Sequence, residues 1–450
     1  MASTARFVLL SACLLAACGK DIALTSPVAL IDLSATPAVL QPGATVQLRP
    51  VFQSGTGRID PDIGPVTSGA SYSVGPFDRA RQYTLTVTSG ASTLTDVLDI
   101  PFTYRERVTE LTASVNARSD HGAVLLASGS VMVVGGRSTG PLSNDSAELF
   151  STSTFVHTPV GNLSTGRRDP ALIVPADGTV WSFGGQPNDP TLSVATVVEQ
   201  WVSTPTPGWS ALGVLRVSRQ NHTATQLADG RILVLGGLVN GGLAEDAAGE
   251  IWTPAVGSRL PAVALPTHRE SHSVTELGDG TLLIVGGRDG VTGAVLPTFE
   301  RWDPATESVV ATGPLVAARA THAAVRLGNG RVLVIGGEAN ATSLRSAEIY
   351  DPVTGLFTAT GDLVQAVSNV RAVALRSGEV LVAGGQVGTR SATAIMQAFS
   401  PSSGSFRVFG NGLPLPRSGH SLTLLPDSRV LLLGGDPGTD FPVAVAYWID

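Results

Sequence analysis

The chain has 450 residues, a formal net charge of −7, 14% charged residues and 43% hydrophobic residues. This balance provides no strongly basic surface, so nucleic-acid binding is not expected. The only cysteines are Cys13 and Cys18, so the rest of the chain can form no disulfide, catalytic thiol or cysteine metal site.

The first residues have the pattern of an export signal. Arg6 precedes a short apolar stretch, Phe7 to Leu15, which is too short to span a bilayer. The sequence Leu15-Ala16-Ala17-Cys18 resembles the lipobox of bacterial lipoproteins. That resemblance implies removal of residues 1–17, lipid attachment at Cys18 and a tether at residues 18–22. Gly19, in place of an aspartate, favours the outer membrane. The alternative is an ordinary secretory signal that contains a cysteine by chance.

Residues 23–104 form a separate segment of short strand-like runs. The runs Thr45 to Leu48 and Tyr83 to Val87 alternate in polarity between prolines and glycines, which predicts a small β-sandwich. The stretch from Gly57 to Val87 resembles bacterial Ig-like domains. Such a segment would act as an adhesive module or as a stalk.

Seven Gly-Gly doublets dominate residues 105–450. Each closes a short aliphatic run, and they recur about every fifty residues, a period typical of propeller blades built from four short strands. The doublets are Gly135-Gly136, Gly184-Gly185, Gly236-Gly237, Gly286-Gly287, Gly336-Gly337, Gly384-Gly385 and Gly434-Gly435.

The features of each repeat follow the same order. A first strand, such as residues 323–327, leads through a turn such as Asp229-Gly230 to an aliphatic second strand. We expect these Asp-Gly and Asn-Gly turns to be two-residue hairpin loops. After the doublet comes a third strand with an acid two residues before an aromatic, as in Glu348-Ile349-Tyr350.

These features, together with the turn from Asp351 to Gly355, resemble the kelch repeat over residues 105–450. The resemblance implies an all-β chain with a seven-bladed kelch-type β-propeller, preceded by the small Ig-like β-sandwich. Another antiparallel barrel or sandwich is the alternative. The seventh repeat ends after its third strand, and residues 107–113 read as a fourth strand. We therefore expect this N-terminal strand to complete the last blade and leave no open edge.

An arginine precedes six of the seven first strands, and five of them have the pattern Arg-x-x-His. The candidate ligand-binding residues are Arg118, Arg167, Arg219, Arg269, Arg319 and Arg417, with His121, His222, His272, His322 and His420. Repeat two has Pro170 in place of histidine, and repeat six has Val367 and Val370, with Arg371 just beyond. The kelch resemblance places this motif near one mouth of the central channel. Guanidinium groups there would suit carboxylates, phosphates or acidic sugars.

A second interpretation of the motif is structural. A feature of nearly every blade is expected where every blade needs it, and each histidine could hydrogen-bond a neighbouring backbone group. Each arginine could pair with a third-strand glutamate: Glu148, Glu199, Glu250, Glu300 and Glu348. Ligation of one metal ion by several of the histidines is not expected, because the blades hold them apart. The ligand site and the paired lattice both stay open at this point.

Enzyme families with this fold make specific demands on the chain. Galactose oxidase combines a kelch propeller with an Ig-like module, and its copper-radical chemistry needs a Cys–Tyr cross-link, a second tyrosine and two histidines. No cysteine follows Cys18, and we place Tyr350 and Tyr447, the only tyrosines after Tyr104, at aromatic positions of the repeat. Copper-radical oxidase activity is therefore not expected. Sialic-acid epimerases of the kelch type would need only Arg, Glu or His in the channel.

Two functions are compatible with these observations. We expect a monomeric lipoprotein of the bacterial cell envelope that binds a protein or glycan through unequal loops such as residues 238–248 and 288–296. It would need no cofactor or metal and would contact the membrane through its lipid alone. The alternative is a sugar-modifying enzyme with an arginine-lined channel mouth. A fully paired Arg–Glu lattice would favour the first function, and an unpaired Glu or His in the channel would favour the second.

Overall fold

The structure is a computed structural model that describes residues 31–111, 116–138, 144–187, 196–240, 249–261, 267–388, 391–439, 442 and 445–450. The expected signal, Cys18 and the tether lie outside these residues. Within them, the regular elements are β-strands, and no helix is long and apolar enough to cross a bilayer. Contacts divide this part of the chain into a small unit (residues 31–38, 46–74 and 81–100) and a large unit (39–45, 75–80 and 101–450).

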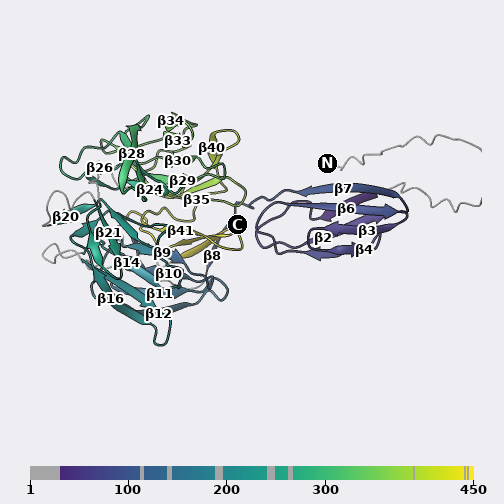
Figure 1. Cartoon of the computed structure of the whole chain (residues 1–450), viewed down its shortest axis with the longest axis horizontal. Helices are drawn as coiled ribbons and strands as arrows, with labels where there is room; N and C mark the ends of the chain where they lie inside the picture. Colours follow the sequence, from purple (N-terminus) through teal and green to yellow (C-terminus); the bar gives the residue numbers. More distant parts are fainter. Residues whose placement is uncertain are drawn as a thin grey trace, which may run out of the picture. The chain divides into compact units, whose positions relative to one another are not determined.

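The small unit consists of two antiparallel sheets (Figure 1). One has the order β1 (Ile31–Thr36), β2 (Val46–Phe52), β5 (Tyr72–Val74), and the other has the order β4 (Gly64–Val66), β3 (Thr56–Asp60), β6 (Arg81–Ser89), β7 (Ser92–Ile100). Every second residue of the long strand β6 is buried, from Tyr83 through Leu85 to Val87. Because successive side chains of a strand point to opposite faces, this alternation gives the unit one apolar and one polar face along β6.

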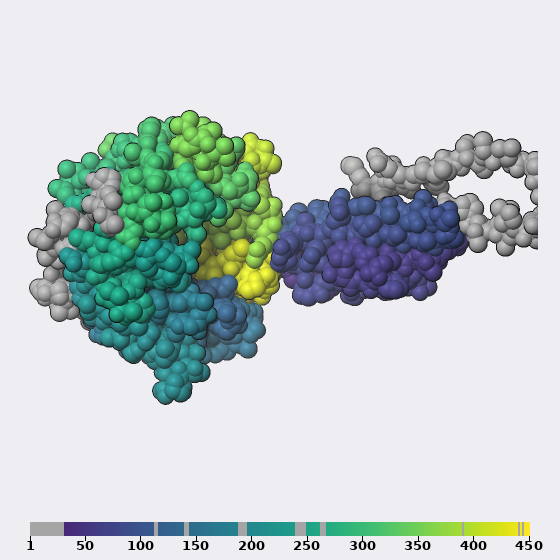
Figure 2. Space-filling model, viewed as in Figure 1, coloured from purple at the N-terminus to yellow at the C-terminus, as the bar shows by residue number. Residues whose placement is uncertain are grey.

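The large unit is a seven-bladed propeller of four-stranded antiparallel sheets, and the blades follow one another around the ring in sequence order (Figures 1 and 2). From the inside outward, the first three blades are β9 (Gly122–Leu125), β10 (Val131–Val134), β11 (Ser146–Phe150), β12 (His157–Asn162); β13 (Ala171–Ile173), β14 (Val180–Phe183), β15 (Val197–Val202), β16 (Gly208–Val214); and β18 (Thr223–Gln226), β19 (Ile232–Leu235), β21 (Gly249–Thr253), β22 (Gly257–Arg259).

Blades four to seven have the same order. They are β24 (Ser273–Glu276), β25 (Leu282–Val285), β27 (Thr298–Asp303), β28 (Ser308–Pro314); β29 (Ala323–Arg326), β30 (Val332–Ile335), β33 (Ala347–Asp351), β34 (Leu356–Ala359); β35 (Arg371–Ala374), β36 (Val380–Ala383), β39 (Met396–Ser400), β40 (Ser405–Val408); and β41 (Ser421–Leu424), β42 (Val430–Leu433), β43 (Ala446–Ile449), β8 (Val108–Leu111). The expected all-β, seven-bladed propeller is confirmed.

The second strand of each blade lies in the core. In β30 all four residues, Val332–Ile335, are inaccessible to solvent. Leu333 and Ile335 pack with Val380 and Val382 of the next blade. A strand covered on both faces must be apolar at every position, which explains the aliphatic runs in the sequence.

The Gly-Gly doublets join neighbouring blades through the backbone. The second glycine of each doublet donates its N–H to the carbonyl of the residue at the arginine position of the following blade, over 2.8–2.9 Å. Both glycines have positive φ, and a Cβ on Gly336 would lie 2.5 Å from the carbonyl oxygen of Val367. The doublet is therefore required because the backbones of adjacent blades approach so closely.

The ring is closed by the N-terminal strand of the large unit. β8 pairs with β43 along its length, from Val108 opposite Ile449 to Leu111 opposite Ala446. Gly435 of the last blade also donates its N–H to the Arg118 carbonyl of the first blade over 2.9 Å. The expected completion of the seventh blade by residues 107–113 is confirmed for residues 108–111, whereas residues 112–115 lie outside the described part of the chain.

The hairpin turns differ from our expectation. Leu227 donates its N–H to the Arg231 carbonyl (2.8 Å), and Gly230 donates to the Leu227 carbonyl (2.9 Å), so the loop has three residues and not two. The glycine has φ +86°, while the Asp229 carboxylate accepts the N–H of Arg231 over 3.1 Å. These bonds and the left-handed glycine are typical of a type I turn followed by a glycine bulge.

Candidate functional site

Each Arg-x-x-His motif lies immediately before the innermost strand of its blade, and its arginine is buried. The six arginines at positions 118, 167, 219, 269, 319 and 417 are at most 1% exposed. Each donates one guanidinium N–H to the carbonyl of the first glycine of its own blade's doublet, over 2.7–3.3 Å. These side chains therefore point into the blade and fix the doublet from the inside.

Five of the six guanidinium groups form an ion pair with the third-strand glutamate of the same blade. The pairs are Arg118–Glu148, Arg167–Glu199, Arg219–Glu250 (2.7 Å), Arg269–Glu300 (2.6 Å) and Arg319–Glu348 (2.6 Å). The glutamates also accept backbone N–H groups, as Glu348 does from Val316 over 2.7 Å. This arrangement is the paired lattice of the structural interpretation, and the arginines do not line a shared surface.

In blade six both members of the ion pair, the arginine and the glutamate, are replaced by uncharged residues. Where Val367 replaces the arginine, the glutamate position is taken by Gln397. Gln397 is fully buried, and its Oε1 accepts the N–H of Gln365 over 3.0 Å. The amide keeps the backbone contact and removes a carboxylate that would have no partner.

Blade seven keeps its arginine and replaces the glutamate with a tyrosine. Arg417 donates to the Tyr447 hydroxyl over 3.2 Å, and its guanidinium carbon lies 4.6 Å from the centre of the tyrosine ring. The strand register places Tyr447 opposite Leu432, where Glu348 lies opposite Val334. Our placement of Tyr447 at the aromatic position was therefore wrong, since that position belongs to Ile449.

The histidines lie between neighbouring blades. Nε2 of His121, His272 and His322 hydrogen-bonds a hydroxyl on the inner strand of the preceding blade, at Ser421 (3.0 Å), Thr223 (3.1 Å) and Ser273 (2.8 Å). For these three, the partner of Nε2 is a side chain, whereas His222 and His420 interact with the backbone at Phe183 and Ala383. All five rings, His222 and His420 included, lie over the first glycine of the preceding doublet, where a Cβ would come within 2.5–3.2 Å of Cε1.

Burial sets the charge of the histidines. Burial, together with the charge of the neighbouring arginines, lowers the pKa of His121, His222, His272 and His322 to about 3. The pKa of His420 also lies well below its ordinary value, for the same reasons. The five rings are therefore neutral at physiological pH and act as packing groups between blades.

A residue with left-handed backbone conformation lies between the arginine and histidine positions of every blade. The seven residues, which we call the inner ring, are Asp120, Asp169, Asn221, Ser271, Thr321, Asn369 and Gly419, with φ between 45° and 63°. Backbone hydrogen bonds join neighbours in the ring, for example from the Asp169 N–H to the Asp120 carbonyl (2.7 Å). Such bonds join Gly419 to Asp120, Asp120 to Asp169, Asn221 to Ser271 and Ser271 to Thr321, so these residues lie next to their counterparts in the adjacent blade.

The inner ring surrounds an open cavity of ≈ 360 Å³. All its members except Gly419 line the cavity, together with His222, His272, His322, Glu338, Ser368, Arg371 and Gln386. Every lining residue is polar or charged. Because unpaired polar groups are costly to bury against apolar surface, this cavity suits a polar ligand.

The charges of the cavity come mainly from three blades. Burial raises the pKa of Asp169 to about 7, and the charge of neighbouring Asp120 contributes, while Arg371 and Arg168 oppose the shift. Burial also raises the pKa of Asp120, again opposed by Arg371. The glycine at position 419 makes room for Asp120, since a Cβ there would collide with the Asp120 carboxylate.

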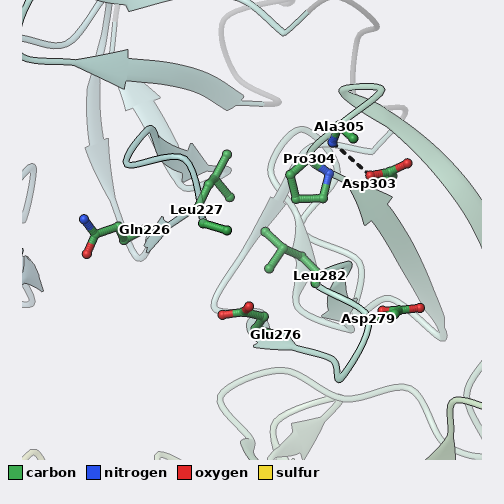
Figure 3. Close-up of a pocket in the computed structure, with 10 residues that line it drawn as sticks. Gln226, Leu227, Glu276, Asp279, Leu282, Asp303, Pro304 and Ala305 are labelled. Carbon is green, nitrogen blue, oxygen red and sulfur yellow. Dashed lines mark hydrogen bonds between the residues drawn. The ribbon is translucent and has the colours of Figure 1, made fainter.

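A second, smaller pocket of ≈ 150 Å³ lies at the opposite ends of the inner strands. The first hairpin turns of blades three and four and the turn after β27 line it, with Gln226, Glu276 and Asp279 among the residues (Figure 3). Asp303 accepts the backbone N–H of Ala305 over 2.9 Å. Asp279 is paired with Arg301 and caps Thr281, so its carboxylate already has partners.

The sequence-based list of candidates missed Asp120, Asp169 and Arg371. A signal for them was present, because the residue before each histidine varies between blades while the arginine and histidine recur. Blades two and six, which depart from the motif, contribute Asp169 and Arg371. The departures from the repeat, more than the repeat itself, indicated the cavity.

The described residues contain no cluster of common metal ligands. No group of three or more His, Cys, Asp or Glu side chains in this part of the chain is placed to hold a metal ion. The histidines lie between blades, and three of them are hydrogen-bonded to hydroxyl groups.

Comparison with known proteins supports the fold. A family model described as the Kelch motif matches residues 319–363, which span blade five. Among solved structures, 542 chains match, and one is a fungal alcohol oxidase of the AA5 family in complex with copper. It is 15% identical with a TM-score of 0.61, and the match covers 76% of this chain and 75% of that chain. No curated protein matches the sequence. The chain thus has a kelch-type β-propeller fold, a fold that hosts many unrelated functions.

Proposed function

We propose that this protein is a lipid-anchored protein of the bacterial cell envelope whose propeller is a binding scaffold for a protein or a glycan. One observation carries the proposal: the arginines that recur in the blades already have hydrogen-bond and ion-pair partners inside the blades. The recurring residues are thus occupied in holding the fold. Recognition of a partner then falls to the segments that differ between blades.

These variable segments begin at the Gly-Gly doublets, on the face where the cavity opens. The residue after each doublet pairs with the residue after the arginine position, as in the ladder between β23 (Arg269–Glu270) and β26 (Arg288–Asp289). A similar ladder joins β17 (Ser218–Gln220) to β20 (Leu238–Asn240). In blades five and six the same pairing is a single bridge, and the loop itself forms a hairpin, β31 (Glu338–Ala339) with β32 (Thr342–Ser343) and β37 (Gln386–Val387) with β38 (Ser391–Ala392). The loops therefore start from fixed positions around the cavity.

The loop of blade four is an example of a built contact surface. The carboxylate of Asp289 accepts the N–H groups of Val291 and Thr292 over 3.0 and 2.7 Å, which fixes the loop, while Val291 is 80% exposed at its tip. An ordered loop with an exposed apolar tip can bind a partner at a small entropic cost.

The alternative function, a sugar-modifying enzyme with an arginine-lined mouth, is not favoured. It needs several guanidinium groups that can contact a substrate, and the six arginines of the motif are buried within the blades, which leaves Arg371 as the one arginine among the described lining residues of the cavity. Five of them are paired with glutamates. The sixth, Arg417, has no glutamate partner and packs against the ring of Tyr447.

The scaffold is tested by site-specific photo-crosslinking in cells. A photoreactive residue at position 291 lies on the loop face, and one at Val353, which is 92% exposed, lies in a turn at the opposite ends of the strands. We expect defined adducts from position 291 and none from position 353. Equal labelling, or no adduct from either position, would argue against a partner on the loop face.

The anchor requires a separate test, because it rests on residues 15–18 of the sequence. We propose acylation at Cys18 and location at the outer membrane, with the Ig-like segment as a spacer. Cys18→Ala is expected to release the protein from the membrane fraction and abolish incorporation of labelled fatty acid. Retention of the variant in the membrane would exclude this anchor.

A further inference from the structure

We infer that the inner-ring cavity binds a small hydroxylated primary amine, such as an amino sugar, with its ammonium group at Asp120 and Asp169. This site lies inside the ring of loops and uses none of the residues assigned to the proposed scaffold. It therefore goes beyond that function, and either can hold without the other.

The charged side chains that line the cavity favour a ligand with one positive charge. Asp120 and Asp169 face Arg371, whereas Glu338 is already paired with Arg288 over 2.7 Å. The histidines of the lining are neutral, so with Glu338 paired the lining residues themselves leave a net charge of −1 when both aspartates are ionised. Arg168, which does not line the cavity, also lowers the pKa of both aspartates. A ligand with a single ammonium group would neutralise the net charge of the lining.

The aspartates are available for such a ligand. The Asp120 carboxylate accepts the hydroxyl of the preceding Ser119 over 3.2 Å, a contact that uses one of its four lone-pair sites. Asp120 and Asp169 are neighbours in the inner ring, joined by the backbone bond between them. An ammonium group has three donors and can reach both carboxylates at once.

The other side of the cavity offers neutral hydrogen-bonding groups. Blades three to five contribute Asn221, Ser271 and Thr321 at the same ring position as the aspartates. His322 also lines the cavity, and its Nε2 is hydrogen-bonded to the Ser273 hydroxyl over 2.8 Å, so its ring forms part of the wall.

The size and lining of the cavity define the class of ligand. Its ≈ 360 Å³ lies near the lower end of the range of small-molecule sites, roughly 300–1,000 Å³, so the ligand is a single small ring or a short chain. The lining has no aromatic residue other than histidine on which a sugar could stack. Selectivity must therefore come from charge and hydrogen bonds. An acidic sugar would bring a further negative charge to the two aspartates and is disfavoured.

Titration calorimetry on the purified full chain tests this inference at pH 7.2, just above the pKa of about 7 of Asp169 and below the pKa of the glucosamine amine. The probes are glucosamine, glucose and glucuronate, which differ mainly in charge. We expect glucosamine to bind about tenfold or more tightly than glucose, since a hydrogen bond to a charged group is stronger than a neutral one. Glucuronate is expected not to bind.

Two variants locate the site. Asp169→Asn and Asp120→Asn place at their positions the residue that blades three and six already carry at Asn221 and Asn369, and asparagine tolerates positive φ. Each variant is expected to weaken glucosamine binding about tenfold and to reduce its advantage over glucose. Asp279→Asn, the same change in the pocket at the opposite ends of the strands, serves as the matched control and should leave binding unaltered.

The inference is overturned if glucose and glucosamine bind equally, if none of the sugars binds, or if both cavity variants keep the affinity of the parent chain. Equal loss in the control variant would also overturn it, because the site would then lie elsewhere. Unchanged melting temperatures of the variants exclude misfolding as the cause of lost binding. The crosslinking experiment at position 291 does not depend on any of these results.

Discussion

Arg319 and Glu348 show how charged side chains are accommodated in the interior of this fold. Both side chains are fully buried, and the polar contacts of the pair lie within blade five and the segment that connects it to blade four. Burial of a charge is costly unless a partner and hydrogen bonds compensate it. The pair is therefore stabilising only as a pair, which is consistent with the joint replacement by Val367 and Gln397 in blade six.

The first prediction concerns this pair. Glu348→Ala leaves the Arg319 guanidinium and the Val316 N–H without their acceptor, and we expect a loss of about 3–5 kcal/mol in the free energy of unfolding. Glu379→Ala, which breaks an exposed pair with Arg407, should cost less than about 1 kcal/mol. Urea unfolding followed by tryptophan fluorescence measures both, because all six tryptophans lie in the propeller. Similar losses in the two variants would contradict the structural role of the buried pair.

The second prediction concerns acid stability. The pKa of His121, His222, His272 and His322 is about 3 in the folded protein, below the usual 6.5 of an unfolded chain, so unfolding takes up protons between these values. Their contribution to stability is present above pH 6.5 and is lost as the pH falls from 6.5 towards 3. Each can remove up to about 1.4 kcal/mol per pH unit in this window.

Urea unfolding at pH 7.5, 6.0 and 5.0 should therefore show a stability that falls at an increasing rate. The raised pKa of Asp169 acts in the opposite direction between about pH 4 and 7, but it is one group against several. His322→Gln should reduce the slope by about one proton. A stability that is constant from pH 7.5 to 5.0 would exclude neutral buried histidines.

At the scale of the secondary-structure element, the Gly-Gly doublet is the feature that determines how blades pack. The doublet ends the second strand. The carbonyl of its first glycine accepts a guanidinium N–H from the arginine of the same blade, and the N–H of its second glycine donates to a backbone carbonyl of the next blade. A strand that ends in this way is joined by hydrogen bonds to two blades at once. The doublet thus couples the internal order of one blade to the position of its neighbour.

The third prediction compares two glycines of blade five with similar backbone angles. Gly336 (φ +56°) lies against the Val367 carbonyl, whereas a Cβ on Gly355 (φ +71°) would meet nothing within 4 Å. Alanine at positive φ costs about 1 kcal/mol at either position. We expect Gly336→Ala to cost about 1–3 kcal/mol more, because the neighbouring blade must shift. Equal costs in urea unfolding would show that the close approach is not needed.

At the scale of the whole molecule, the propeller ring is closed by β8, which comes from the N-terminal end of the propeller sequence and joins the blade at its C-terminal end. β8 is the outer strand of blade seven, and the chain that follows it leads into blade one. Backbone bonds from Gly435 to Arg118 and from Asp120 to Gly419 also cross the same junction. Blade seven and blade one are therefore joined both by the chain and by the contacts found between the other blades.

The fourth prediction tests this closure. Thr109→Pro interrupts the pairing of β8 with β43, and Thr358→Pro interrupts the corresponding outer strand of blade five. The second change should fray one edge, whereas the first also frees the junction of the ring. We expect the loss of stability in Thr109→Pro to be about 2 kcal/mol larger. Equal melting curves by tryptophan fluorescence would show that β8 is only an edge strand.

The sequence predicted the propeller well because backbone contact repeats in every blade. Gly336 and Val332–Ile335 reflect demands that any blade of this fold makes, so they recur and can be counted. The site was harder to predict, because local sequence does not show which residue of Arg-x-x-His faces the channel. The positive φ of Asp169 and its neighbours turns the second intervening residue towards the cavity, while the arginine turns inward.

The inner ring separates the chemistry of the channel from the construction of the blades. Its flanking arginine and histidine positions do the structural work, and the residue between them must only tolerate a left-handed backbone. In this chain that position already holds aspartate, asparagine, serine, threonine and glycine. Seven single-codon changes could therefore rewrite the ligand preference of the channel while the framework is left intact. Both natural divergence and directed evolution of ligand preference could therefore act on these seven positions alone.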